Sequence, residues 1–179
     1  MIPIIYYQDE HILIRSMVES DIKALQDGFT RQGWGKDIET LEGYFNAQQK
    51  NDGTFVFVAE WDGQPAGYTV MYREAENGPY AHKSIPYISD FNVFIPYQRR
   101  GIGKKIMDAA EAKAFETSNT VCLGVGLHYG YGSAQRMYAK RGYIPDGSGV
   151  WYMDRQHEQY APCANDDDLI LYMAKDKPE

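Results

Sequence analysis

The sequence predicts one α/β domain in which a mixed sheet is flanked by helices. Short apolar, β-prone runs alternate with segments whose apolar residues recur at spacings of three and four, as in an amphipathic helix. A chain of 179 residues suits one domain with a proper core, and no repeat or linker divides it. We therefore expect one domain over residues 1–179, with its core between residues 12 and 174.

The first half of the chain predicts a strand, two helices and a β-hairpin. Ile22, Leu25 and Phe29 recur on one helical face, and Ser20 before them is the expected N-cap. Asp62-Gly63, between two apolar runs, is a hairpin signal. The predicted strands are 12–15, 54–61 and 65–72, and the second predicted helix is 37–50.

The second half begins with the strand, loop and helix around which we expect the fold to be organised. The apolar run 88–95 ends at Pro96, and a helical pattern starts at Ile102 and continues to about residue 118. A strand and a short helix follow, and Gly142 is expected to close that helix. The remaining predicted elements are strands 121–125, 143–145, 149–153 and 169–174, the helix 133–141, and a polar, irregular segment 154–168.

Composition and charge argue against several classes of function. The net charge of −7 argues against general binding to nucleic acid or to a membrane surface, both of which require a basic patch. Cys122 and Cys163 form no C-x-x-C motif and indicate no disulfide framework, so the cytoplasm is the expected location. No apolar run approaches the length of a membrane span, the N-terminus lacks the features of a signal peptide, and no metal site is predicted.

The loop 98–103 has the chemistry of a phosphate site. It precedes a helix, whose first backbone amides have no partner within the helix and lie at the positive end of the helix dipole. Gly101 and Gly103 allow a ligand to approach the backbone closely. Four cations surround this loop in a chain that is acidic overall: Arg99, Arg100, Lys104 and Lys105. An anion, most simply a phosphate, would be stabilised there.

Two common phosphate motifs do not fit this loop. A P-loop would need a glycine in place of Gln98 and a hydroxyl residue in place of Lys105. A dinucleotide fingerprint would need a third glycine in place of Ile106. Both failures disfavour a nucleotide-binding protein, which competition between ATP and CoA would test.

Gln98-x-x-Gly101-x-Gly103 instead resembles the acyl-CoA pyrophosphate loop of the GNAT superfamily of N-acyltransferases. A second stretch, Ala134-Gln-Arg-Met-Tyr138-Ala-Lys-Arg-Gly-Tyr143, resembles the superfamily pattern Ala-x-x-Leu-Tyr-x-Lys-x-Gly-Phe. The two motifs stand in the family's order, separated by a helix and a strand, and the order of predicted elements is similar from residue 12 to residue 174. The resemblance implies an acetyl-CoA-dependent N-acetyltransferase, which transfers an acetyl group to a primary amine by direct attack in a ternary complex.

The resemblance also implies which residues bind acetyl-CoA and which one acts as the general acid. Backbone amides in the loop would hold the CoA pyrophosphate, and the preceding strand would pair with the pantetheine arm. Tyr138 matches the tyrosine that often protonates the departing thiolate, because a phenol with a pKa of about 10 keeps its proton at neutral pH. Its alternative role is that of a core tyrosine. The expected cofactor residues are Phe91, Asn92, Val93, Arg99, Arg100, Gly101, Ile102, Gly103 and Lys104.

This chain departs from the family pattern at four positions, one of which is Pro96, one residue later than usual. Relatives often carry a cofactor-contacting Asn where this chain has Tyr131. Some relatives carry a catalytic Glu at the position of Gly126, and others carry one near Tyr87. These departures leave the general base open.

Four routes for removing the proton of the amine remain. Asp90 is favoured, because a carboxylate inside an apolar strand would have its pKa raised by desolvation. Its alternative role is to bond a neighbouring loop. His128, in the loop after the next strand, is the second candidate and Glu60 the third. The fourth route is an ordered water relay without a dedicated base.

Contacts to the acceptor are expected outside the two motifs. Trp34 lies in a loop that often borders the acceptor site in relatives, and Trp151 and Tyr152 flank the acidic segment 154–168. Aromatic rings beside carboxylates suit a cationic amine, although exposed loop aromatics and a solvated acidic face explain the same pattern. A small-molecule amine, an antibiotic, and a protein lysine or N-terminus all fit, and the sequence allows a homodimer. The alternative function is a catalytically weak acyl-CoA-binding or sensing module.

Overall fold

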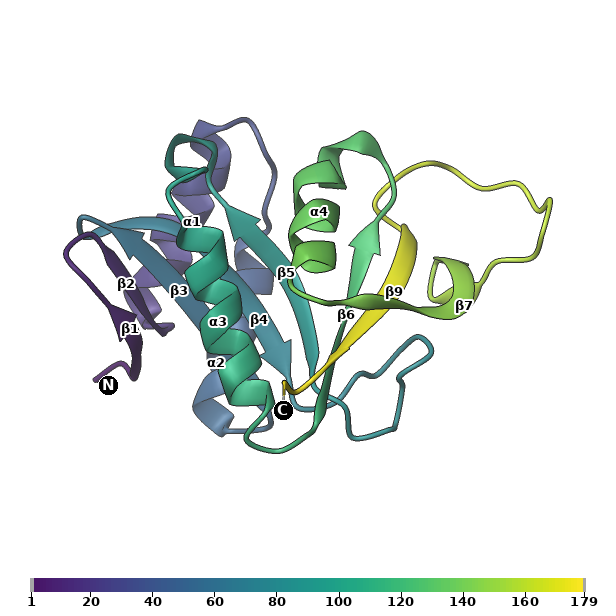
Figure 1. Cartoon of the computed structure of the whole chain (residues 1–179). Helices are drawn as coiled ribbons and strands as arrows, with labels where there is room; N and C mark the ends of the chain where they lie inside the picture. Colours follow the sequence, from purple (N-terminus) through teal and green to yellow (C-terminus); the bar gives the residue numbers. More distant parts are fainter. Residues whose placement is uncertain (1, 179) are drawn as a thin grey trace. The chain divides into compact units, whose positions relative to one another are not determined.

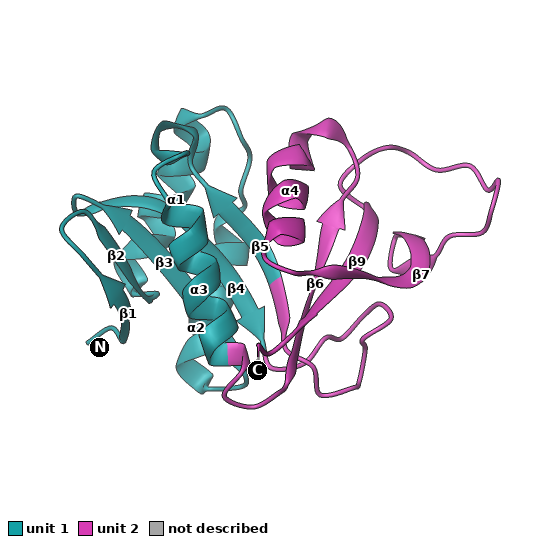
Figure 2. Cartoon of the chain, viewed as in Figure 1, with its two compact units in different colours: residues 1–72, 89–113 teal, residues 73–88, 114–179 magenta. Residues whose placement is uncertain are grey.

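A computed structural model describes residues 2–178, which divide into two units (Figures 1 and 2). Unit 1 contains residues 1–72 and 89–113, and unit 2 contains residues 73–88 and 114–179. The strand β5 (Tyr87–Val93) begins in unit 2 and ends in unit 1. Its first residues pair in parallel with β6. The pairs β1–β2, β2–β3, β3–β4, β6–β9, β7–β8 and β7–β9 are antiparallel. The predicted fold class, a mixed sheet flanked by helices, is confirmed.

The strands of unit 1 follow the order β1-β2-β3-β4-β5. Asp62 and Gly63 close the β3–β4 hairpin with φ values of 48° and 75°, the left-handed backbone that the Asp-Gly signal predicts. An additional edge strand, β1, pairs with β2 and was not predicted from the sequence. The strand bounds are β1 Ile5–Gln8, β2 Ile12–Ser16, β3 Thr54–Trp61 and β4 Gln64–Tyr72.

Helices cover both faces of the unit 1 strands (Figure 1). On one face, Leu25 and Phe29 of α1 and Leu41 of α2 pack against β3 and β4 in a common apolar core. On the other face, α3 buries Ile102 and Ile106 completely or nearly so. The alternation of side chains along a strand lets β3 supply both cores. The helix bounds are α1 Glu19–Arg31, α2 Ile38–Lys50 and α3 Ile102–Ala114, so α3 ends four residues before the predicted end.

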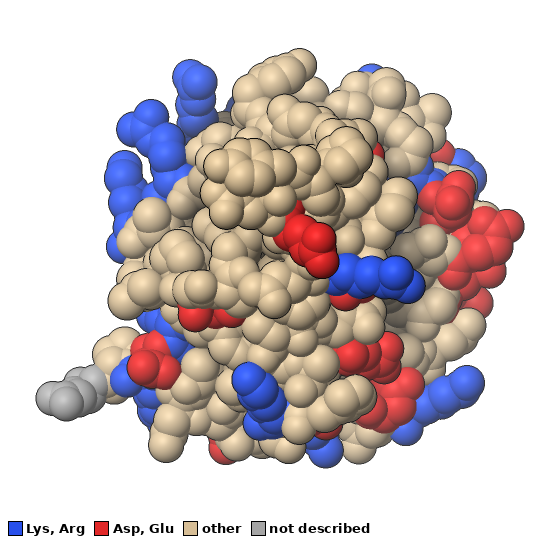
Figure 3. Space-filling model, turned by 90° about the vertical axis from the view of Figure 1, so that its right-hand side faces the viewer, with Lys and Arg blue, Asp and Glu red and all other residues tan. Residues whose placement is uncertain are grey.

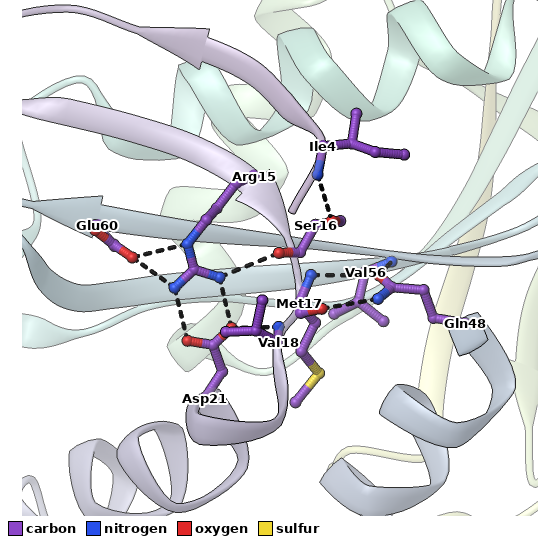
Figure 4. A network of polar contacts seen from close by, with 9 residues as sticks. All are labelled: Ile4, Arg15, Ser16, Met17, Val18, Asp21, Gln48, Val56 and Glu60. Atoms are coloured by element: carbon purple, nitrogen blue, oxygen red, sulfur yellow. Dashed lines mark hydrogen bonds and ion pairs between the residues drawn. The ribbon is translucent and has the colours of Figure 1, made fainter. Parts of the chain in front are cut away.

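A buried network of polar side chains joins β2, α1 and β3 (Figure 4). Arg15 donates to the Asp21 carboxylate from Nη1 at 2.6 Å and from Nη2 at 2.8 Å. It also donates from Nε to Oε1 of Glu60 at 2.8 Å. The Asp21 carboxylate raises the pKa of Arg15, and the side chains of both residues are less than 10% exposed. The network therefore fixes the first turn of α1 against the sheet.

The start of α1 differs from the prediction. The helix begins at Glu19, so Ser20 lies within the first turn and is not the N-cap. The Asp21 carboxylate accepts a hydrogen bond from the backbone N–H of Val18 at 2.8 Å. A carboxylate in the first turn satisfies a backbone donor at the positive end of the helix, as the serine hydroxyl was expected to do. The expected N-cap was two positions too late, at Ser20 instead of Val18, because Arg15 orients Asp21, a contact that local sequence does not show.

We expect Asp21→Ala to lower the free energy of unfolding by about 3 kcal/mol, because it removes one partner of a buried ion pair. Urea denaturation would measure the loss. The matched control is Asp27→Ala on the same helix, which breaks the exposed pair with Lys23 and should cost less than about 1 kcal/mol. Equal losses for the two variants would contradict the structural role of the Arg15 network.

The strands of unit 2 follow the order β5-β6-β9-β7-β8. The two predicted strands 143–145 and 149–153 are one interrupted strand, β7, whose register with β9 shifts between Pro145 and Val150. The left-handed φ values of Gly147 and Gly149, 87° and 81°, accompany this bulge. The element bounds are β6 Thr120–Gly126, α4 Gly132–Lys140, β7 Ile144–Tyr152, β8 Arg155–Gln156 and β9 Leu169–Asp176. The short strand β8 falls in a segment expected to be irregular.

Candidate functional site

The loop before α3 has the backbone geometry of an anion site. Arg99 and Gly101 have left-handed φ values of 62° and 81°, and α3 begins immediately afterwards at Ile102. The bond from the Lys105 N–H to the Gly101 carbonyl, at 3.2 Å, opens the α-helical pattern. The amides of the three preceding residues thus lie in the first turn, where the helix supplies no acceptor. They are available to an anion.

The cations around this loop have different surroundings. The Arg100 guanidinium stacks on the ring of Trp61, with Cζ 4.8 Å from the ring centroid. The Lys105 ammonium lies 3.8 Å from the ring centroid of Tyr7. Arg99 and Lys104 are both exposed. All four cations therefore lie at or near the N-terminus of α3, and aromatic rings position two of them, Arg100 and Lys105.

This donor set fits a pyrophosphate. A Cβ atom added at Gly101 would have no heavy atom within 4 Å, so the space over the loop is open to a ligand. The Gln98 side-chain amide donates to the Val93 carbonyl at 3.0 Å and ties the loop to the end of β5. Backbone amides at a helix N-terminus, together with cations, are what a diphosphate requires.

The end of β5 lies close to the backbone of β4. A Cβ atom at Gly67 would lie 2.2 Å from the Asn92 carbonyl oxygen and 2.9 Å from Cα of Val93, so only glycine fits there. The Asn92 side chain donates to the Asp90 carboxylate at 2.9 Å. Phe91, Asn92 and Val93 are partly exposed. Residues 91–93, which are proposed to accompany the pantetheine arm, are therefore fixed in two ways. Their backbone contacts Gly67 closely, and the Asn92 side chain is hydrogen-bonded to Asp90.

Asp90 is the centre of a hydrogen-bonded cluster within unit 1. Its φ of 48° is left-handed, which interrupts the regular strand. Its Oδ2 atom accepts from the Tyr68 hydroxyl at 2.5 Å and from the Tyr44 hydroxyl at 3.0 Å. The same oxygen pairs with the Lys36 ammonium, and both side chains are 18% exposed. Asp90 is thus bonded to the loop between α1 and α2, which is the alternative role expected for it from the sequence. It also directly precedes residues 91–93, which are partly exposed and are expected to bind the cofactor.

The two tyrosines of this cluster remain proton donors. Burial raises the pKa of Tyr68 and of Tyr44, and the negative charge of Asp90 raises both further. Each hydroxyl therefore keeps its proton and donates it to the carboxylate. Tyr44, Tyr68 and Lys36 were not identified from the sequence, because no local pattern connects them with Asp90.

The third candidate base, Glu60, belongs to the Arg15 network instead. Its Oε1 atom accepts from Arg15 Nε at 2.8 Å and from Arg15 Nη2 at 2.5 Å. The Arg15 side chain is 9% exposed and is also paired with Asp21, so it stays bound to Glu60 and makes that carboxylate a poor proton acceptor. The structure therefore gives Glu60 a structural role.

Tyr138 lies on α4 in unit 2 with its side chain directed into the protein. The residue is 5% exposed, and its ring meets that of Tyr143 edge-on, with the centroids 5.7 Å apart. Burial raises the pKa of Tyr138, and Tyr87 and Tyr131 raise it further. The phenol therefore keeps its proton throughout the neutral and mildly alkaline range. This satisfies one requirement of a general acid, that it is protonated before the reaction.

Two of the departures from the family pattern are structurally coupled. A Cβ atom at Gly126 would lie 2.3 Å from the ring of Tyr131. The Tyr131 ring thus occupies the space that a side chain at position 126 would need. Its hydroxyl donates to Asp167 at 2.9 Å. Glutamate at 126 and tyrosine at 131 therefore exclude each other in this arrangement.

His128 is held by hydrogen bonds at both ring nitrogens. Its Nδ1 atom accepts from the backbone N–H of Gly130 at 3.0 Å. The ring proton must then be on Nε2, which lies 3.0 Å from Oδ1 of Asp167. The hydrogen bond from His128 lowers the pKa of Asp167, and Tyr131 lowers it further. In this arrangement neither nitrogen can accept a substrate proton, which weighs against His128 as the base.

The three aromatic residues expected at the acceptor site belong to different units. In unit 1, Trp34 is 44% exposed and its ring centroid lies 6.4 Å from that of Phe29. In unit 2, Trp151 donates from Nε1 to Ser148 at 2.7 Å. Tyr152 contacts Asp166 at 3.4 Å in the same unit. Trp34 therefore stands close to the Asp90 cluster through Phe29, while Trp151 and Tyr152 form hydrogen bonds within unit 2.

Acidic side chains form separate groups on the face drawn in Figure 3. The segment 154–168 of unit 2 is largely exposed and includes Asp154, Glu158, Asp166, Asp167 and Asp168. Over the part of the chain that the structure describes, no three metal-binding side chains gather into a possible metal site. None of the helices in that part has the length and apolarity that crossing a membrane requires.

Comparison with known proteins matches the order of these elements to one family. The model of the acetyltransferase (GNAT) family matches residues 20–143. An uncharacterized N-acetyltransferase, YhfO of Bacillus subtilis (strain 168), is 26% identical over 125 residues, which cover 69% of this chain and 80% of that protein.

Solved structures show the same fold. A ribosomal L7/L12 alpha-N-protein acetyltransferase, RimL, superposes with a TM-score of 0.73 at 12% identity, covering 99% of this chain and 96% of that one. The acetyl-CoA complex of yncA, a putative acetyltransferase from Salmonella typhimurium, superposes with a TM-score of 0.67 at 15% identity, covering 93% and 94%.

Proposed function

This chain belongs to the acetyltransferase (GNAT) family, and on that premise we propose that it transfers the acetyl group of acetyl-CoA to a primary amine by direct attack in a ternary complex. The observation that carries the proposal is the loop before α3, which lies within the matched segment. There a left-handed glycine, helix amides without a partner within the helix, and four cations provide a site for a diphosphate. The expectation of an acetyl-CoA-dependent acetyltransferase agrees with the family.

When bound, acetyl-CoA supplies a thioester whose carbonyl carbon accepts the amine. Arg99, Arg100 and Lys104 neutralise the pyrophosphate, and the amides of Gly101, Ile102 and Gly103 donate to it. The strand from Phe91 to Val93 accompanies the pantetheine arm through main-chain groups.

Two side chains handle protons in this proposal. Asp90 accepts one proton of the acceptor ammonium, and Tyr138 donates its proton to the departing sulfur. The second proton that the nitrogen loses as the amide forms returns Tyr138 to its phenol form. Tyr138 is protonated at neutral pH, as a general acid must be, while the burial that raises its pKa also makes it a weaker acid. We rank His128 behind Asp90 as a base, because both of its ring nitrogens already form hydrogen bonds.

The acceptor is a small-molecule amine or a protein amine. A protein amine is supported by the likeness to RimL, a ribosomal L7/L12 alpha-N-protein acetyltransferase. Trp34, Trp151 and Tyr152 are the residues that we propose to contact the acceptor. We propose that the chain forms one catalytic domain, works in the cytoplasm without nucleic acid or membrane as a partner, and is able to form a homodimer.

The second candidate is an acyl-CoA-binding or sensing module with weak catalysis. It is favoured by Tyr131, whose ring fills the space of a catalytic glutamate at position 126. In that case acetyl-CoA would bind, but no amine would be acetylated.

A thiol-release assay separates the two candidates. The protein would be incubated with acetyl-CoA and a panel of small amines and of peptides with free N-termini. Amine-dependent release of CoA supports the transferase. Stabilisation by CoA without release on any amine supports the binding module, since a ligand that binds only the folded state raises the melting temperature. A melting temperature unchanged by CoA would contradict both.

We expect Asp90→Asn to lower kcat by about a hundredfold at pH 7, at the weak end of general base catalysis. The loss should shrink above about pH 10, because an alkylamine with a pKa of about 10.4 then loses its proton to water without a base. Profiles of kcat against pH for both proteins measure this difference. Asp62→Asn, at an exposed ion pair with His11, is the matched control and should follow the wild type. Parallel profiles for Asp90→Asn and wild type would remove Asp90 from the mechanism.

A further inference from the structure

The ammonium of Lys36 lies in a cage of three aromatic rings. Its Nζ atom is 5.8 Å from the ring centroid of Phe29, 5.7 Å from that of Tyr44 and 5.8 Å from that of Tyr68. The same ammonium pairs with Asp90. The cage comes from α1, α2 and β4, and the carboxylate comes from β5, so four elements of unit 1 converge on one cation.

This set of groups is the chemistry that recognises an alkylammonium. Aromatic faces attract a cation, and the attraction increases when water is excluded. The carboxylate supplies the opposite charge and a hydrogen-bond acceptor. Two hydroxyls orient that carboxylate, with O–O distances of 2.5 Å for Tyr68 and 3.0 Å for Tyr44. The site is therefore built for the end of an unbranched primary amine, and the chain's own lysine occupies it.

The occupant comes from a loop that contains two glycines. Lys36 lies between α1 and α2, outside both helices, and follows Gly33 and Gly35. Gly33 has a left-handed φ of 76°, and Cβ atoms added at either glycine would meet nothing within 4 Å. The loop backbone therefore has room to change conformation.

The carboxylate keeps its other partners when the lysine leaves. Tyr44, Tyr68 and Asn92 still donate to Asp90, and an incoming ammonium restores the ion pair. A buried carboxylate is then not left without a counter-charge, which is the expensive outcome of breaking such a pair. Exchange of the Lys36 ammonium for the ammonium of a ligand therefore costs less free energy than removal of Lys36 alone.

We propose that this cage is the subsite for the primary ammonium of the acceptor, and that Lys36 is an internal occupant which the acceptor displaces. The inference rests on the proposed function insofar as the acceptor is a primary amine. Asp90 immediately precedes Phe91, so an ammonium in the cage lies beside the strand assigned to the pantetheine arm. Displacement of Lys36 delivers the acceptor nitrogen to the base and restricts access to amines that compete with a lysine.

The test measures binding of n-butylammonium chloride without acetyl-CoA, from the dependence of the melting temperature on its concentration. Lys36→Met removes the ammonium and keeps an unbranched side chain. If Lys36 occupies the site for about 90–99% of the time, its removal lowers the apparent dissociation constant about 10- to 100-fold. Lys36→Arg keeps a cation and should bind the probe as weakly as the wild type does.

Two controls show that the probe enters the cage. Lys23→Met makes the same substitution at an exposed ion pair on α1 and should leave the dissociation constant unchanged. Adding Asp90→Asn to Lys36→Met should abolish the gain. If Lys36→Met does not fold, Lys36→Gln replaces it, since the neutral amide leaves the carboxylate without a cation in the same way.

Equal dissociation constants for the wild type and the neutral variants would overturn the inference, as would a gain that persists with Asp90→Asn. Because the assay contains no acetyl-CoA, its result is independent of turnover. A protein that releases CoA with amines but shows no gain on losing Lys36 refutes the cage alone. A protein that shows the gain but acetylates no amine refutes the proposed reaction and keeps the cage.

Discussion

Tyr138→Phe is expected to lower kcat by a factor of about one hundred to ten thousand, the range of a lost general acid. The substitution removes one hydroxyl and keeps a ring that fits the site, where the residue is 5% exposed and packs against Tyr143. The affinity for acetyl-CoA should change little, because the hydroxyl acts on negative charge that develops on sulfur in the transition state. Because burial raises its pKa, Tyr138 should cause no alkaline fall of kcat below about pH 10.

The measurement combines kcat, once an acceptor is found, with the dissociation constant of acetyl-CoA and a demonstration that chemistry limits turnover. Tyr143→Phe is the matched control, because it removes a hydroxyl from the neighbouring buried ring. That variant should retain kcat within about threefold, since its hydroxyl is not assigned to proton transfer. If Tyr138→Phe behaves like Tyr143→Phe, Tyr138 is a packing residue.

Gly101→Asp is expected to weaken CoA binding by at least a factor of about one hundred relative to Gly101→Asn. A carboxylate about 6 Å from one phosphate charge, at an effective dielectric constant of about 20, costs about 3 kcal/mol. That energy corresponds to a loss in affinity of about a hundredfold.

The asparagine variant separates charge from shape. Gly101 has a φ of 81°, a conformation that Asn and Asp adopt more readily than other side chains, so both variants carry similar backbone strain. Both side chains are also similar in size and enter open space. Calorimetric titration with CoA would measure the affinities, and circular dichroism would confirm the fold. Affinities of the two variants within about threefold of each other would place the pyrophosphate away from this loop.

The sequence by itself determined the features that depend on neighbouring residues. Apolar periodicity located both helices of the first half, the β3–β4 hairpin and the junction of β5 with α3, because each pattern reflects the backbone geometry of one segment. The Gly101-x-Gly103 loop predicted an anion site for the same reason, since a helix N-terminus and its charges are local. The resemblance that this loop and the Tyr138 motif carry agrees with the family match over residues 20–143.

Local signals were insufficient wherever a distant residue decides the outcome. The N-cap expected at Ser20 was wrong because Arg15 orients Asp21 instead. The sequence predicted two strands where the structure has the single strand β7. Pairing with β9 continues on both sides of the glycine bulge, and the local pattern contains no sign of that pairing.

Only the tertiary structure decided how the candidate bases differ. The guanidinium of Arg15 binds the Glu60 carboxylate, and both ring nitrogens of His128 form hydrogen bonds. Lys36, Tyr44 and Tyr68 meet Asp90 from sequence separations of 54, 46 and 22 residues. The residue pattern of a single segment does not predict these contacts, because the contacts depend on how α1, α2, β4 and β5 pack together. The cation cage is therefore a property of the fold, whereas the phosphate loop is a property of its own few residues.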